Sequence, residues 1–154
     1  MSPPATPALP ALIWDPALAT IALNWANTCT DANGDGLLDH NPQRGSTYPG
    51  GSVGENIYAS TGTATPADAV AAWDSEAQYY DLSANTCDGA SYNFMTNLNW
   101  DLCGHYTQLT NRGTLKVGCA IVRCSSLIYS STAICDYSPA GNIADSSGLI
   151  APPY

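Results

Sequence analysis

The sequence predicts a single α+β domain crosslinked by disulfides, and three observations carry this prediction. Apolar residues recur at helical spacing in the first half of the chain and alternate at strand spacing in the last third. The 154 residues are typical of one domain. The even number of cysteines, six, in a chain with only 11% charged residues suits three disulfides. We therefore expect helices packed against a small sheet.

Two helices are predicted in the first half, each beginning with a capping residue followed by proline. The first begins with Asp15 and Pro16, and its apolar stripe comprises Leu18, Ile21, Ala22 and Trp25. The second begins with Thr65 and Pro66, and its apolar face is predicted to comprise Val70, Trp73, Ala77 and Tyr80. A third, short helix is expected at 105–109. Residues 30–52 and 81–99 are rich in turn-forming residues and are predicted to be loops.

A hairpin is predicted in the last third, in addition to a short strand at 53–58. Its first strand alternates through Leu115, Val117, Cys119 and Ile121, and its second spans about 129–137, with a turn near 125–127. Cys119 then lies opposite Cys135, close enough to form a disulfide. Cys124 needs a distant partner, for which Cys29 is the candidate, and Cys87 and Cys103 would close a local loop. No C-x-x-C pair is present, which disfavours a zinc finger.

The charge balance excludes several classes of partner. Thirteen acidic against four basic residues give a net charge of −9. Binding to nucleic acid or to an anionic membrane surface is therefore not expected, because so few cations are present. No apolar run approaches the ~20 residues of a membrane span. The disulfides indicate an oxidising compartment, so we expect an extracellular or secreted protein.

Four segments resemble signatures of a known family. They are Gly54-Glu55-Asn56, Trp73-Asp74-Ser75-Glu76, Gly104-His105-Tyr106-Thr107-Gln108, and the stretch from Cys135 through Tyr137 and Pro139 to Gly141-Asn142. Their order and spacing resemble the CAP superfamily of cysteine-rich secretory proteins, antigen 5 and pathogenesis-related protein 1. The resemblance covers roughly residues 12–143.

The resemblance implies an α-β-α sandwich, in which a small antiparallel sheet lies between helical layers. It places the domain at 13–143, with a Pro/Ala-rich linker or truncated N-terminus at 1–12 and a C-terminal tail at 144–154. The family's first helix has no counterpart before Trp14. Such a truncation would expose apolar surface, so we expect marginal stability or self-association.

The resemblance also implies a cleft that carries His40, Glu55, Glu76 and His105, where His40 is assigned as the only His before the G-E-N segment. The two histidines would bind zinc and leave positions open for water or ligand, while the glutamates orient the imidazoles. A His/Glu-dependent hydrolase, such as a peptidase, is one alternative, although no nucleophile motif is present. An inert structural or interaction domain is the other. Family members are associated with lipid and sterol ligands, and most are binding rather than catalytic proteins.

A second candidate metal site lies at 31–39. The segment D-x-N-x-D-G-x-x-D begins like an EF-hand loop, with Asp31, Asn33, Asp35 and Asp39 as candidate calcium ligands. Pro42 occupies the position of the usual bidentate Glu, so a shorter calcium loop is the hypothesis and an Asx-rich turn is the alternative. Calcium would order this loop and thereby position His40.

Overall fold

A four-stranded sheet lies at the centre of the computed structural model, which describes residues 7–154. The strands are β1 (Ile13–Trp14), β6 (Lys116–Arg123), β7 (Ser131–Ser138) and β2 (Gly54–Ser60), in that spatial order. β7 pairs antiparallel with both β6 and β2, whereas β1 runs parallel to β6. The predicted antiparallel sheet is thus extended by one short parallel strand. Two residues are too few to show an alternating pattern in the sequence.

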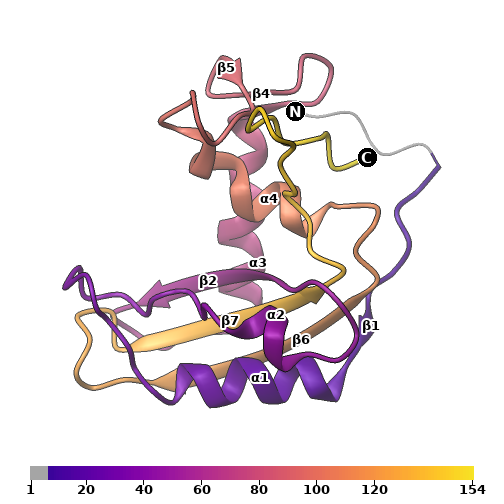
Figure 1. The fold of residues 1–154 in the computed structure, drawn as a ribbon. Coiled ribbons are helices and arrows are strands. Elements are labelled where there is room, and N and C mark those ends of the chain that lie inside the picture. Colours follow the sequence, from indigo (N-terminus) through magenta and orange to yellow (C-terminus); the bar gives the residue numbers. More distant parts are fainter. Residues whose placement is uncertain (1–6) are drawn as a thin grey trace.

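Helices cover both faces of this sheet (Figure 1). α1 (Pro16–Ala26) packs on one face against β6 and β7, and α3 (Pro66–Ser75) with α4 (Gly104–Leu109) lies on the other, against β2. The short elements are α2 (Arg44–Thr47) and the 3-10 turns η1 (Glu76–Gln78) and η2 (Trp100–Cys103). The predicted α-β-α sandwich is confirmed. No helix among residues 7–154 combines the length and the apolar character needed to cross a membrane.

The two long helices begin where their caps predict. Asp15 accepts hydrogen bonds from the backbone N–H groups of Ala17 and Leu18, and Thr65 accepts one from Asp68. The predicted apolar face of the second helix is partly wrong, because Val70 is 46% exposed and the buried residues are Ala69 and Trp73. α3 ends at Ser75, so Ala77 and Tyr80 lie beyond it.

The two predicted loops contain short regular elements. The first contains α2. Within and beside the second, β3 (Tyr80–Asp81), β4 (Thr86–Cys87) and β5 (Ala90–Ser91) form a small antiparallel sheet. All of these elements have two to four residues, which is shorter than the window over which periodicity can be recognised.

Three disulfides crosslink the chain, in the three pairs expected from the sequence. Cys119 and Cys135 are direct cross-strand partners on β6 and β7. Cys29–Cys124 ties the segment after α1 to the end of β6, and Cys87–Cys103 joins β4 to η2. One bridge therefore lies within the sheet, one anchors the segment after α1 to it, and one holds the segment before α4.

The C-terminal segment 144–154, assigned from the sequence to a tail, packs against the domain. Ile150 is buried in a cluster with Tyr80, Tyr92 and Tyr106, and its backbone N–H donates to the Tyr92 carbonyl. Of the predicted N-terminal linker at 1–12, residues 1–6 lie outside the described residues.

Candidate functional site

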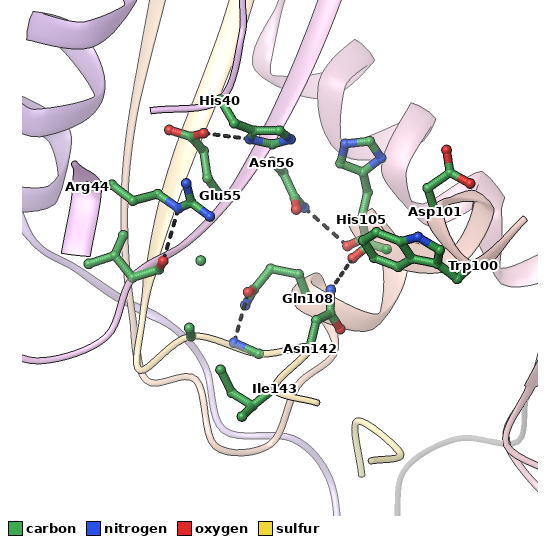
Figure 2. A pocket seen from close by; sticks show the side chains of 15 residues that line it. His40, Arg44, Glu55, Asn56, Trp100, Asp101, His105, Gln108, Asn142 and Ile143 are labelled. Atoms are coloured by element: carbon green, nitrogen blue, oxygen red, sulfur yellow. Dashed lines mark hydrogen bonds and ion pairs between the residues drawn. The ribbon is translucent and has the colours of Figure 1, made fainter. Parts of the chain in front are cut away.

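The sequence motifs converge on one cleft of about 390 Å³ at the edge strand β2 (Figure 2). Its wall comes from four segments: the stretch from His40 to α2, the start of β2, the η2–α4 region, and residues 140–143. These segments belong to both helical layers. The lining residues with functional groups are His40, Arg44, Glu55, Asn56, Asp101, His105, Gln108 and Asn142.

His40 and Glu55 form the first pair in the cleft. The imidazole Nδ1 lies 2.6 Å from Glu55 Oε1, and the backbone N–H of Asn41 donates to the same oxygen at 2.9 Å. The His40 side chain is 57% exposed, whereas that of Glu55 is fully buried. A buried carboxylate thus contacts a solvent-accessible imidazole on the side that faces the protein interior.

His105 and Glu76 form the second pair. His105 Nδ1 lies 2.6 Å from Glu76 Oε1, and Glu76 Oε2 accepts the backbone N–H groups of His105 and Tyr106 at 2.9 and 3.1 Å. A carboxylate suits this place because the first N–H groups of a helix lack partners within it. The ring of Trp73 stacks on the other side of His105, with centroids 6.1 Å apart. Glu76 itself lies behind His105 and does not line the cleft.

The two pairs lie on opposite sides of β2 because Glu55 and Asn56 are consecutive in a strand. Glu55 points toward His40, and Asn56 points toward α4, where its amide donates to the carbonyl of His105 at 3.1 Å. Figure 2 shows Asn56 between the two imidazoles. The edge strand therefore joins the two halves of the site.

Both imidazoles face a carboxylate oxygen with Nδ1. A carboxylate against Nδ1 favours the proton on that nitrogen, so the neutral ring presents Nε2 as a lone-pair donor. Metal-bound histidines use this arrangement. Within residues 7–154, no three His, Cys, Asp or Glu side chains cluster so as to hold a metal ion. A zinc ion held by His40 and His105 would therefore take its remaining ligands from water or from a bound molecule.

Arg44 and Asp136 are among the residues of the site that were not assigned from the sequence. Arg44 donates to the carbonyls of Val53 and Asn41, at 3.1 and 2.6 Å, and presents its guanidinium to the cleft. Asp136 on β7 is fully buried directly opposite Glu55. Burial, followed by the charge of Glu55, raises the pKa of Asp136 to about 8. Asp136 could have been assigned to the site only from the register between β2 and β7, which places it opposite Glu55. The sequence alone does not specify this register.

The predicted calcium loop closes on itself through its own carboxylates. Asp31 accepts backbone N–H groups from Gly34, Asp35 and Gly36, and Asp39 accepts one from Ala32. Gly36 has φ +84°, the left-handed conformation that favours glycine at the sharp turn of such loops. The indole N–H of Trp25 donates to the Asp39 carbonyl at 2.7 Å, which holds the backbone that leads into His40. Calcium binding here stays a prediction.

Comparisons with known proteins agree with one another. A sequence model of the cysteine-rich secretory protein family (CAP) matches residues 5–137. The chain is 37% identical to human GLIPR1-like protein 1 over 157 residues, which cover 100% of this chain and 56% of that protein. It is 36% identical to pathogenesis-related protein 1A1 of Solanum lycopersicum over 134 residues, 87% of this chain and 63% of that one. The chain thus spans little more than half the length of these curated relatives.

Two solved structures share the fold. Schistosoma mansoni venom allergen-like protein 4 is similar with a TM-score of 0.64 and 22% identity, over 95% of this chain and 76% of that one. A crystal structure of NaASP2 with Zn²⁺ is similar with a TM-score of 0.64 and 25% identity, over 95% of this chain and 66% of that one.

Proposed function

Because this chain belongs to the cysteine-rich secretory protein (CAP) family, we propose that it is a secreted protein that binds zinc and a ligand in the His/Glu cleft. One observation carries the proposal: two imidazoles line the same cleft, and each is held at Nδ1 by a carboxylate 2.6 Å away. Three disulfides support secretion, because disulfides persist in oxidising compartments.

The chemistry of the site supports zinc in particular. Zinc accepts neutral imidazole nitrogens and is usually four-coordinate, so two histidines leave two positions for exchangeable partners. Glu55 and Glu76 would act as orienting residues, not as ligands, because each already lies 2.6 Å from the Nδ1 atom of its histidine. NaASP2, which shares the fold, has been crystallised with Zn²⁺.

The ligand would be small and would carry both polar and apolar groups. A volume of about 390 Å³ suits a small molecule or the end of a peptide. Trp100 and Ile143 provide apolar wall, while Arg44 and Asn142 provide polar groups. An anionic group on the ligand would complete the coordination of the zinc and face the Arg44 guanidinium.

The lipid or sterol expected from the family resemblance would suit a different hollow. A groove of about 310 Å³ between α3 and β6 is lined almost wholly by apolar side chains, among them Trp14, Val70, Trp73 and Ile121. Displacement of a fluorescent fatty acid or sterol, lost on Val70→Asp, would support such a ligand. The absence of displacement would contradict it.

The hydrolase alternative has less support. All six cysteines form disulfides, and among the described residues that line the cleft there is no Ser, Thr or Cys. A mechanism with a Ser, Thr or Cys nucleophile would therefore need that residue from outside this lining. The His–Glu pairs remain suitable as general bases, and turnover of a peptide library that is lost in His105→Ala would restore this alternative.

Calorimetric titration of zinc into chelator-treated protein tests the proposal. We expect one ion per chain, and at least a tenfold loss of affinity, about 1.4 kcal/mol, in either His40→Ala or His105→Ala. These are the only two histidines in the sequence, so the double variant contains no other imidazole. Asp74→Asn, on the exposed surface of α3, is the control for a change of charge.

Unchanged zinc binding in the double variant would show that the ion binds elsewhere and would overturn the proposal. The absence of binding in the wild type would leave the cleft as a structural network.

A further inference from the structure

Beneath His40 lies a pair of buried carboxyl groups that metal binding does not account for. Glu55 on β2 and Asp136 on β7 are direct cross-strand partners, so their side chains lie side by side on the same face of the sheet. Both are buried. Three of their four oxygens, Glu55 Oε2 and both carboxyl oxygens of Asp136, have no hydrogen-bond donor among the described residues. Burying oxygen atoms without hydrogen bonds costs free energy. The cost falls if one of the two carboxyl groups carries a proton and donates it to the other, and the position of such a proton is not visible from the heavy atoms.

The surroundings provide little positive charge. From α2, Arg44 acts on Asp136 only at a distance. The residue opposite Asp136 on β6 is Gly118, and Lys116, two residues before it on the same face of β6, pairs with Asp15. α1, which covers this face, contains no ionisable side chain. In the described chain, the only ion pair of either carboxyl is that between Glu55 and His40. Two adjacent buried carboxyls in such surroundings cannot both be ionised.

We propose that Asp136 is a protonated carboxylic acid that donates a hydrogen bond to Glu55 Oε2 and thereby positions the carboxylate that orients His40. This one bond would provide a partner for Oε2 and would share a single negative charge across the pair. Oε1 then remains turned toward the His40 imidazole and the Asn41 N–H. Asp136 would be a positioning residue, because its effect on His40 passes through Glu55.

The second pair in the cleft shows why Glu55 needs such a partner. Glu76 is held by two backbone N–H groups on one oxygen and by His105 on the other. Glu55 receives its backbone N–H and His40 on the same oxygen, so its other oxygen depends on Asp136. The two orienting carboxylates are therefore fixed differently, one by a helix N-terminus and one by a shared proton.

A protonated Asp136 makes stability depend on pH in a definite direction. The carboxyl of an unfolded Asp ionises near pH 4, whereas burial and Glu55 raise the pKa of Asp136 to about 8. Between these values the folded chain binds a proton that the unfolded chain releases, so the contribution of Asp136 to stability falls as the pH rises from about 4 to about 8. Asp136→Asn keeps a hydrogen-bond donor but cannot ionise, so it removes this contribution.

Urea unfolding of the metal-free chain at pH 5 and at pH 8 tests the shared proton. We expect the ratio of the folding equilibrium constants, Asp136→Asn over wild type, to rise at least tenfold from pH 5 to pH 8. The contribution of His105, which contacts Glu76 and not the carboxyl pair, is common to both proteins and cancels in the ratio. Measuring the same ratio in the His40→Ala background removes the contribution of His40. Asp74→Asn, which removes an exposed carboxylate, should show no such rise. A ratio for Asp136→Asn that does not change with pH would overturn the proposal.

The ¹⁵N shifts of the imidazoles test the positioning role. Asp136→Asn should keep the neutral His40 ring protonated on Nδ1, whereas Asp136→Ala should lose this preference. His105 is the internal control, because Glu76 does not depend on Asp136. Loss of the Nδ1 form in Asp136→Asn, or its retention in Asp136→Ala, would contradict the role. If Asp136→Ala fails to fold, the Asn variant still decides. All of these measurements are made without metal. A negative result would therefore contradict the role of Asp136 but not zinc binding, and a negative zinc titration would not contradict the role of Asp136.

Discussion

Replacing Glu76 by Gln isolates what a carboxylate does behind His105. In the wild type, Oε2 accepts the backbone N–H groups of His105 and Tyr106, and Oε1 faces the imidazole Nδ1 at 2.6 Å. Gln has one acceptor oxygen and one amide nitrogen that only donates. The oxygen must serve the two backbone N–H groups, so the amide nitrogen faces Nδ1. The neutral imidazole would then move its proton to Nε2, the nitrogen that a metal needs.

The magnitude follows from these contacts. Two hydrogen bonds from the helix N-terminus change from charged to neutral, and each weakens by about 1 kcal/mol. We therefore expect the free energy of unfolding to fall by about 2 kcal/mol. The loss of an orienting carboxylate lowers metal affinity by about 10–100-fold in comparable sites, or about 1.4–2.7 kcal/mol. The fold should survive, because Gln has nearly the same shape as Glu and keeps its place behind His105.

Three measurements decide this prediction. Imidazole ¹⁵N spectra report the tautomer of His105, with His40 as the reference in the same sample. Calorimetry reports the zinc affinity, and urea unfolding reports stability. Asp74→Asn on the exposed face of α3 removes the same charge without touching either pair. The reasoning is refuted if His105 keeps its proton on Nδ1, or if zinc binds the variant as tightly as the wild type.

Other features of the structure make predictions of their own. Replacing Cys29 and Cys124 with Ser should lower the free energy of unfolding, measured with denaturant, by about 4–5 kcal/mol, because this bridge spans 95 residues. The bridge between Cys87 and Cys103 spans only 16 residues. A smaller loss for Cys29–Cys124 than for Cys87–Cys103 would contradict this prediction. Gly118→Ala would place a Cβ 2.6 Å from the Leu18 backbone carbon, so α1 must shift and stability should fall by about 3 kcal/mol; an unchanged Tm would refute the close approach. Calcium should release heat on binding to the wild type but not to Asp31→Ala, and a flat wild-type titration would end the calcium interpretation.

Local signals in the sequence predicted the helix starts and the hairpin. A capping residue followed by proline acts over one turn, which is why Asp15 and Thr65 mark their helices correctly. The opposition of Cys119 and Cys135 followed from the position of one turn between adjacent strands. In each case the information lies within a few residues or within a single hairpin.

Features that depend on distant pairing could not be predicted in this way. The exposure of Val70 depends on the rotation of α3 on the sheet, which its spacing does not specify. The role of Asp136 depends on which residue of β2 lies opposite it, and β2 is far away in the sequence. A polar residue in an otherwise buried strand is itself a signal, since every residue of β7 is buried, but the partner becomes visible only in the structure.

The position of β2 at the edge of the sheet explains why the cleft uses both helical layers. Consecutive residues of a strand point to opposite faces, so Glu55 reaches His40 and Asn56 reaches the α4 backbone. A slip of one residue between β2 and β7 would exchange these two side chains. The carboxylate would then face α4, and His40 would lose its orienting partner together with the contact to Asp136. The geometry of the His40 imidazole and the Asn56 hydrogen bond to the His105 backbone therefore both depend on one strand register, which couples the chemistry of the cleft to the correct pairing of the sheet.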